Sequence, residues 1–298
     1  MPRRVTSLEV ARTERLTPHM VRVVATGPEL AAFPETEFTD RYVKILFPVP
    51  GVSYPDPLDM EAVRRDLPRE HWPRMRTYTV RAFDAAKAEL TIDFVHHGDT
   101  GLAGPWAAAA EPGDPLRLVG PGGAYAPDRD ADWHLLVGDE AAIPAIGAAL
   151  ERIPAGTPVH AILQVGAQAD EQPLPTAADL RLRWLHRDTD AVRLVDAVRE
   201  LGFPAGRVHA FVHGEAVEVR EVRRHLTRER GVPRTTCRCP GTGAAGRTRR
   251  ASAPTSRSRL WRSRPSRRSP QVGDGAPVRA GLNGRYPGID VQLTPFCR

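Results

Sequence analysis

A chain of 298 residues is long enough for about two domains, each with its own hydrophobic core. No apolar run approaches the roughly 20 residues of a membrane-spanning helix, and no hydrophobic stretch follows the charged N-terminus, so we expect no membrane span, no signal peptide and a cytoplasmic location. The net charge of +6 is unevenly distributed. Residues 235–298 hold 13 arginines, no lysine and two acidic residues, a net of +11, whereas residues 1–234 hold 29 basic and 34 acidic residues, a net of −5. All three cysteines also lie after residue 234. The net charge of residues 1–234 therefore gives no reason to expect a nucleic-acid partner, and we expect none.

The first 128 residues show short alternating segments separated by glycine- and proline-containing turns, with little helix. A short helix is expected near residues 60–66 and one or two helical turns at 106–110. Six strands are expected near residues 5–11, 20–25, 42–47, 76–82, 89–95 and 116–119. Short strands with such turns are typical of a small antiparallel barrel.

From Trp133 onward, apolar runs alternate with helical stretches. Strands are expected near residues 134–137, 159–165, 182–185 and 207–212, and helices near 141–152, 191–201 and 216–229. This order predicts βαβ units and a parallel sheet. We therefore expect a barrel domain over 1–128, an α/β domain over 129–234 and an irregular tail over 235–298.

The stretch from residue 76 to residue 106 carries the first candidate site. Alternation along Arg76-Thr77-Tyr78-Thr79 places Arg76 and Tyr78 on one face of a strand and the two threonines on the other. A polar, glycine-bearing segment, residues 97–101, follows the next strand and offers backbone N–H donors. A guanidinium, a phenol ring and such a loop together suit a ligand with an aromatic ring and a phosphate.

A second candidate site lies at the ends of the expected parallel strands, where Gly138-Asp139-Glu140 and Gly214-Glu215 follow apolar runs. Ligands of open α/β sheets bind outside the carboxyl ends of the strands. No G-x-G-x-x-G motif is present, and each glycine could equally serve the local backbone alone.

These motifs together resemble the siderophore-interacting protein family, flavoprotein ferric-siderophore reductases related to ferredoxin reductases. The resemblance covers roughly residues 4–234 in unbroken order. Its motifs are Thr17-Pro18-His19-Met20-Val21-Arg22-Val23, Tyr42-Val43-Lys44-Ile45, Arg76-Thr77-Tyr78-Thr79, residues 93–101, residues 136–140 and Gly214-Glu215-Ala216. It implies an FAD-binding antiparallel barrel followed by an NAD(P)H-binding α/β domain.

The resemblance also implies roles for individual residues. Those implied to hold the flavin and its phosphates are Arg76, Thr77, Tyr78, Thr79, Asp93, Val95, His97, Gly98, Thr100, Gly101, Ala103 and Trp106. Those implied to face the nicotinamide nucleotide are Gly138, Asp139, Glu140, Gly214 and Glu215. No catalytic side chain and no metal site is assigned.

One segment departs from the family pattern. The family usually reads Gly-Pro-Ala-Ser before the residue that precedes the tryptophan, whereas this chain reads Gly101-Leu102-Ala103-Gly104-Pro105. The serine hydroxyl is absent and a proline cannot donate an N–H. We therefore expect weaker phosphate binding than in the family.

The implied activity is hydride transfer from NAD(P)H to FAD and single-electron transfer to Fe(III) in a ferric siderophore. Such substrates are often anionic, and Lys44, one of only two lysines, is the candidate substrate-binding cation; a solvated strand lysine is the alternative. His96 and His97 are neighbours on an extended segment and point to opposite faces, so they cannot chelate one metal together. We expect a monomer. The alternatives are a general NAD(P)H:flavin or ferredoxin-type reductase, and an inactive remnant whose basic tail binds polyanions.

The tail departs from the family after Arg234. The sequence Cys237-x-Cys239 has the spacing of half a metal site, but no matched second pair follows it, so no metal is expected. The run of arginine, serine and proline resembles a nucleic-acid-binding arm, yet Trp261 is almost its only aromatic residue, and disorder is the preferred interpretation.

A shift of reading frame would explain this departure. The family continues here with a stretch like Ser-Val-Ser-Gly-Tyr-Trp-Arg-Arg-Gly. If each codon takes the last base of one triplet and the first two of the next, residues 235–246 can encode Asp-Asp-Leu-Ser-Val-Ser-Gly-Tyr-Trp-Arg-Arg-Gly. We hypothesise a frameshift after Arg234. Resequencing of the DNA across codons 230–250 tests this, and an unshifted frame shared by close relatives would contradict it.

Overall fold

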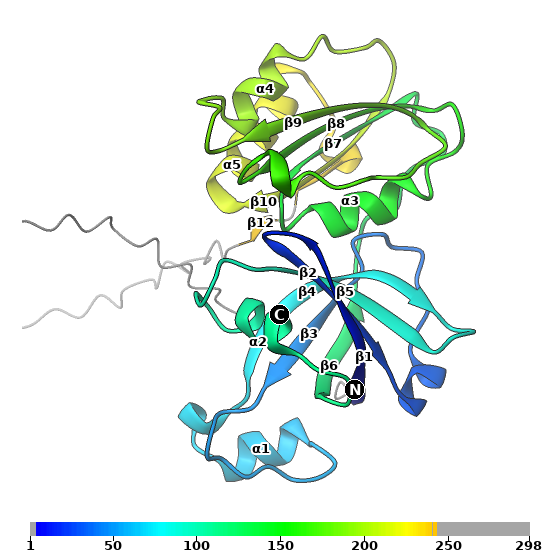
Figure 1. The fold of residues 1–298 in the computed structure, drawn as a ribbon. Coiled ribbons are helices and arrows are strands. Elements are labelled where there is room, and N and C mark those ends of the chain that lie inside the picture. The colour runs from blue at the N-terminus through cyan, green and yellow to red at the C-terminus, as the bar shows by residue number, and fades with distance from the viewer. Residues whose placement is uncertain (1–3, 240, 243–298) are drawn as a thin grey trace, which may run out of the picture. The chain divides into compact units, whose positions relative to one another are not determined.

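The computed structural model describes residues 4–239 and 241–242. Its first part is a closed antiparallel barrel with the strand order β1-β2-β5-β4-β3-β6, drawn in blue to green in Figure 1. The strands are β1 (Val5–Thr17), β2 (Met20–Thr26), β3 (Tyr42–Phe47), β4 (Arg74–Asp84), β5 (Glu89–Val95) and β6 (Pro115–Gly122). The expected six-stranded barrel is confirmed, with strands that are mostly longer than predicted.

Alternation along the strands fills the barrel. Val21 and Val23 of β2 and Ile92 and Phe94 of β5 point inward and are at most 4% exposed. The helices of this part are short: α1 (Met60–Asp66), α2 (Ala103–Ala109) and two 3-10 turns, Pro28–Ala32 and Arg69–His71. Asp59 caps α1 by accepting a hydrogen bond from the backbone N–H of Glu61 at 2.8 Å.

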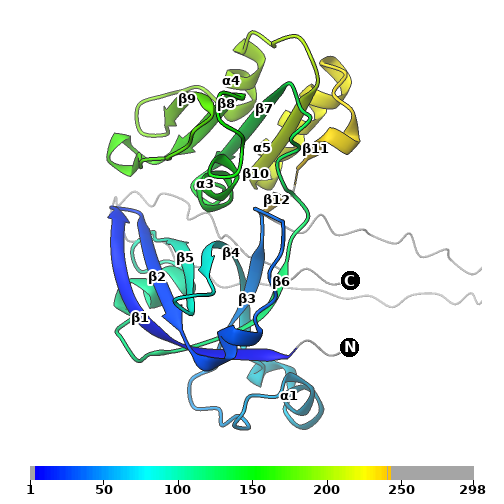
Figure 2. The ribbon, with the colours of Figure 1, turned by 90° about the vertical axis from the view of Figure 1, so that its right-hand side faces the viewer.

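The second part is a parallel α/β sheet. Its strands are β7 (Trp133–Asp139), β8 (Pro158–Val165), β9 (Asp179–His186), β10 (Val208–Glu215), β11 (Cys237–Arg238) and β12 (Gly241–Thr242). The sheet order is β11-β10-β7-β8-β9, and β12 also pairs with β10. The sheet and its helices are visible in Figure 2. The expected parallel sheet is confirmed.

Helices cover both faces of this sheet because its strands are apolar on both sides. The helices are α3 (Ile143–Leu150), α4 (Leu194–Glu200) and α5 (Ala216–Arg224); a 3-10 turn, Gln168–Asp170, follows β8, and a π-helical turn, His225–Glu229, follows α5. Leu135 and Val137 of β7 pack on the side of α4 and α5, whereas Leu136 packs on the side of α3. Burial on both faces is characteristic of parallel strands. Among the described residues, no helix combines the length and the apolar character that a membrane crossing requires.

The sheet continues beyond the expected boundary at Arg234. After a 3-10 turn, Arg234–Thr236, β11 pairs in parallel with β10, Cys237 opposite Ala210, and Gly241 pairs with Gly214. Residues 237–238 and 241–242 thus add two short strands where the composition had favoured disorder. The remainder of the expected tail, residues 243–298, lies outside the described residues.

Candidate functional site

The barrel opens where β4 separates from β5. Residues 74–79 of β4 pair with β3, from Arg74 opposite Phe47 to Thr79 opposite Tyr42, but the pairing of β4 with β5 begins only at Val80. The predicted Arg76-Thr77-Tyr78-Thr79 segment therefore lies at the point where one side of its strand leaves the sheet.

Tyr78 presents an aromatic ring at this opening. It pairs with the buried Val43 and so points toward the barrel interior. Its ring centroid lies 4.4 Å from that of Phe94, which in turn lies 5.5 Å from that of Trp106. Burial raises the pKa of Tyr78 to about 12, so the phenol stays neutral. Two predicted flavin residues, Tyr78 and Trp106, thus belong to one aromatic cluster.

Arg76 shares the inward face with Tyr78, opposite Ile45, as alternation predicted. One guanidinium nitrogen donates a hydrogen bond to the carbonyl of Met75 at 2.9 Å. Within the described part of the chain no carboxylate forms an ion pair with Arg76, so its charge is available to an anionic ligand. Thr77 lies on the opposite face, where it pairs with Lys44.

The loop after β5 takes backbone conformations that favour glycine. Gly98 has a φ of 57° and Gly101 a φ of 90°. His97, Gly98, Thr100 and Gly101 are exposed, whereas Ala103, the first residue of α2, is only 3% exposed and belongs to the barrel core. The predicted loop therefore presents its backbone to solvent beside the aromatic cluster.

Gly104 explains part of the departure from the family pattern. A Cβ atom at this position would lie 2.8 Å from the carbonyl oxygen of Val95 and 3.3 Å from the Cα of His96. The start of α2 therefore packs closely against the end of β5, and a side chain at 104 requires this contact to relax. Pro105 occupies the third position of α2, where a backbone N–H has no partner within the helix.

Asp93 has a structural partner that the sequence did not reveal. Its carboxylate is 4% exposed and accepts two hydrogen bonds from Arg22, at 2.7 Å from Nε and 2.9 Å from a terminal nitrogen. The two residues face each other across β2 and β5. This bidentate pair gives the Asp93 carboxylate a structural role between the two strands.

The second candidate site lies at the topological switch point of the parallel sheet. Chain order reverses between β7 and β10, the strands that end in the two predicted glycine motifs. Asp139 joins the two loops, since one carboxylate oxygen accepts from the N–H of Ala141 at 3.0 Å and the other from the N–H of Glu215 at 2.8 Å. Burial raises the pKa of this carboxyl. Such a switch point is the usual binding crevice of open α/β sheets.

The two glycines of this site are required by close approach. A Cβ at Gly138 would lie 2.2 Å from the Cβ of Ala142, and a Cβ at Gly214 would lie 2.6 Å from a carboxylate oxygen of Asp139. Gly214 also has a φ of 142°. The structural interpretation of both glycines is therefore sufficient by itself, because neighbouring atoms of the chain fill the space that each side chain would occupy.

Glu140 and Glu215 already have partners. Glu140, 6% exposed, forms a bidentate ion pair with Arg187, which follows β9. Glu215 caps α5 by accepting from the N–H groups of Val217 at 2.8 Å and Glu218 at 3.1 Å. Their carboxylates hold the loops in place.

Sequence reasoning missed three polar residues, His19, Asp170 and Arg187. Asp170 follows β8 and is 3% exposed, and both of its carboxylate oxygens lie 2.9 Å from Nδ1 of His19. The His19 ring lies 6.0 Å from that of His97, and Arg187 is the partner of Glu140. His19 belongs to the Thr17-Pro18-His19-Met20 motif, which could have indicated it. Asp170 and Arg187 have no local signal, because their partners lie far away in sequence.

Comparison with known proteins identifies the family. The model for the siderophore-interacting FAD-binding domain matches residues 9–125, and the model for siderophore-interacting protein matches residues 131–241. The chain belongs to the siderophore-interacting protein family. The family's FAD-binding domain coincides with the barrel, and the match to the second model continues through β11, past Arg234.

Relatives cover most of the chain. The ferric vibriobactin reductase ViuB of Vibrio cholerae is 34% identical over 233 residues, which are 76% of this chain and 84% of that protein. The NADPH-dependent ferric-chelate reductase of Escherichia coli is 32% identical over 236 residues, 77% of this chain and 89% of that protein. A crystal structure of a siderophore utilization protein from T. fusca matches with a TM-score of 0.68 and 36% identity over 81% of this chain and 93% of that one. The expected cofactors, FAD and NAD(P)H, and the classification as a flavoprotein oxidoreductase are confirmed. The individual site residues and the domain boundaries remain predictions.

Proposed function

We propose that this chain is a ferric-siderophore reductase that passes electrons from NAD(P)H through FAD to Fe(III), which leaves the siderophore as Fe(II). The observation that carries the proposal is the combination, in one chain, of a family FAD-binding barrel with a parallel sheet whose switch point brings together the two glycine motifs at the ends of β7 and β10. The two relatives named as ferric reductases support the choice of substrate.

The barrel residues fit an FAD molecule. Tyr78 offers a neutral ring that is half-buried at the opening between β4 and β5, and Arg76 offers a cation beside it for a phosphate. The glycine-containing loop at residues 98–101 offers exposed backbone N–H groups. When bound there, FAD supplies the conversion of a two-electron hydride donor into single-electron deliveries.

At the sheet, the residues fix the shape of the switch point. Gly138 and Gly214 let the two loops approach each other closely, and Asp139 fixes the spacing of these loops through its hydrogen bonds. We assign the nicotinamide nucleotide to this crevice, with Glu140 and Glu215 supporting the loops and making no direct contact through their carboxylates.

The substrate is assigned to the barrel side. Lys44 lies on the outer face of β3 opposite Thr77, a proposed flavin residue of β4, and we assign it to an anionic ferric siderophore. Fe(III) is held by hard oxygen ligands far more strongly than Fe(II), so reduction releases the metal. We expect the protein to act as a monomer in the cytoplasm, where reduced nicotinamide nucleotides are available; size-exclusion chromatography with light scattering tests the monomer.

The test compares three readouts on the purified full chain. We expect bound FAD by absorbance, anaerobic bleaching of that absorbance by NADPH or NADH, and formation of Fe(II) from a ferric siderophore, followed with a ferrous-iron chelator. Tyr78→Ala should lose bound FAD, whereas Tyr54→Ala, a matched tyrosine outside the proposed site, should retain it.

Three outcomes separate the alternatives. Reduction of free flavin without reduction of ferric siderophores would favour a general NAD(P)H:flavin reductase. A colourless protein that takes up no FAD would overturn the enzyme proposal. Salt-sensitive binding of that colourless protein to DNA would identify a polyanion-binding remnant.

A further inference from the structure

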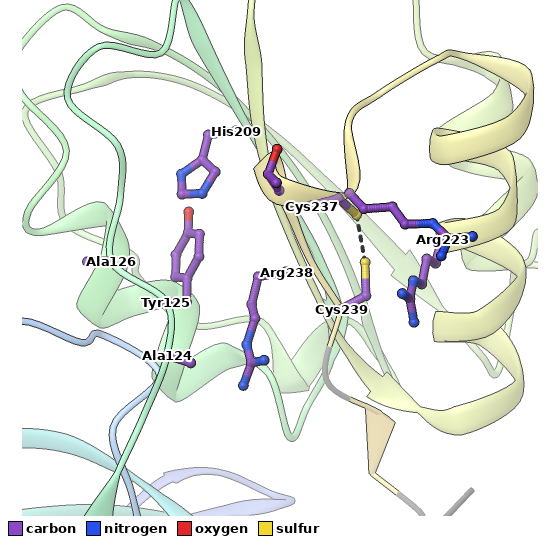
Figure 3. Close-up of a pocket in the computed structure, with 10 residues that line it drawn as sticks. Ala124, Tyr125, Ala126, His209, Arg223, Cys237, Arg238 and Cys239 are labelled. Carbon is purple, nitrogen blue, oxygen red and sulfur yellow. Dashed lines mark hydrogen bonds between the residues drawn. The ribbon is translucent and has the colours of Figure 1, made fainter.

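Two cysteines meet at the edge of the parallel sheet. Cys237 lies in β11 and Cys239 follows two positions later, so their side chains point to the same side of an extended segment. Their sulfur atoms lie 2.7 Å apart, and Figure 3 shows them facing each other. Cys237 is 8% exposed and Cys239 is half-buried. Cys237 pairs with Ala210, four residues before Gly214, and the proposed electron transfer assigns no role to either cysteine.

A basic cavity gives access to this pair. It has a volume of about 320 Å³ and is lined by both cysteines together with Arg223, Arg234 and Arg238. None of the residues that line it is acidic, although Asp40 approaches Arg238 at 3.5 Å from outside the lining. Three guanidinium groups around two thiols favour an anionic ligand that reacts with sulfur.

The two thiols are chemically unequal. A hydrogen bond from Cys239 lowers the pKa of Cys237, whereas the same contact and burial raise the pKa of Cys239. The thiolate is the form that attacks a disulfide. Cys237 is therefore the attacking residue and Cys239 the one that resolves the mixed disulfide.

We propose that Cys237 and Cys239 form a redox-active dithiol that exchanges with small anionic disulfides of the glutathione type. The Cys237 thiolate attacks one sulfur of the small disulfide and displaces one thiol, which takes up a proton. Cys239 then loses its proton, attacks the Cys237 sulfur and displaces the second thiol. In total one protein dithiol and one small disulfide give one protein disulfide and two small thiols, so atoms and electrons balance.

The extended segment allows this disulfide. Residues two apart in a strand lie about 6.6 Å apart at the Cα atoms, within the roughly 4.4–6.8 Å range that disulfides span. Because both cysteines line the cavity, a small thiol can reach the bond and reduce it again.

The test uses the full chain with Cys297→Ser, which leaves only the two cysteines of interest. The protein is equilibrated with oxidised and reduced glutathione, quenched in acid, alkylated and analysed by peptide mass spectrometry. We expect a 237–239 disulfide that returns to two alkylated thiols on addition of reduced glutathione. Cys239→Ser should instead accumulate a mixed disulfide on Cys237.

The basic cavity has its own test. Oxidised glutathione should react about tenfold faster than the neutral hydroxyethyl disulfide at low salt, and Arg223→Gln should reduce that preference. Two thiols that stay fully alkylated in excess oxidised glutathione would overturn the dithiol proposal, and equal rates for the two disulfides would overturn the role of the arginines. Peptide masses showing leucine at position 237 and valine at position 239, as the shifted reading frame gives, would also overturn it. None of these readouts depends on flavin or on reductase activity.

Discussion

His134 makes the folded α/β sheet sensitive to acid. This residue of β7 is fully buried, both ring nitrogens lack a hydrogen-bond partner among the described residues, and the ring of His209 on the adjacent strand lies 5.8 Å away. Burial and, secondarily, His209 lower the pKa of His134 to about 4. The unfolded chain has the ordinary histidine pKa of about 6.5. Between these two values the unfolded state binds more protons, so stability falls as the pH decreases.

The magnitude follows from the two pKa values. Between pH 7 and pH 5 this histidine alone reduces the free energy of unfolding by about 2 kcal/mol. His134→Leu removes the titrating group and the two buried nitrogens without a large change of volume. We therefore expect the loss of stability between pH 7 and pH 5 to be about 2 kcal/mol smaller in the variant than in the parent chain.

Urea unfolding at pH 7 and pH 5, followed by circular dichroism, measures this difference. The contributions of the other titratable groups are the same in both proteins and cancel in the comparison. His71→Gln, at an exposed position outside the sheet, serves as the control and should leave the pH dependence as it is in the parent chain. An equal loss of stability in His134→Leu and in the parent chain would refute the reasoning, because the buried imidazole would then make no contribution.

Three further substitutions test the candidate sites. Gly104→Ala should lower the free energy of unfolding by about 1–3 kcal/mol and also lower FAD content, because the new Cβ would lie 2.8 Å from the backbone oxygen of Val95. An unchanged melting temperature would contradict the close packing of α2. In Asp139→Asn one of the two carboxylate oxygens that accept backbone N–H hydrogen bonds is replaced by an NH2 donor. We therefore expect the KM for NAD(P)H to rise about tenfold with FAD content unchanged. An unaltered KM would argue against a nucleotide at this crevice. Arg22→Leu leaves the buried carboxylate of Asp93 unpaired and should lower the free energy of unfolding, measured with urea, by about 3 kcal/mol. The double variant with Asp93→Leu should recover much of that loss. Equal stability of the single and double variants would show that the ion pair is not the cause.

The order of strands and helices was predictable from sequence because it depends on local periodicity. Alternating apolar residues such as Val21 and Val23 indicate a strand with one buried face, and the continuous apolar run at Leu135 to Val137 indicates a strand buried on both faces. The glycines of the candidate nucleotide site were found for the same reason, since Gly138 directly follows such a run and Gly214 follows another after one residue.

The partners of the charged side chains could not be predicted in this way. Arg22 and Asp93 are 71 residues apart, His19 and Asp170 are 151 apart, and Glu140 and Arg187 are 47 apart. No local pattern relates such positions, because strand pairing and loop packing bring them together only in the folded chain. Composition similarly favoured disorder after Arg234, whereas residues 237–238 and 241–242 pair with the edge of β10.

The sequence by itself therefore determined the order of an antiparallel barrel and a parallel α/β sheet and indicated the candidate flavin and nucleotide sites, since periodicity, turn residues and motif order are local properties. Only the tertiary structure decided what individual side chains are free to do. It assigned Asp93, Glu140 and Glu215 to structural contacts, left Arg76 and Tyr78 available to a ligand, and brought Cys237 and Cys239 together beside a basic cavity. The physical reason is that the availability of a charge or a thiol depends on its burial and its partners, and both are set by contacts between segments distant in the chain.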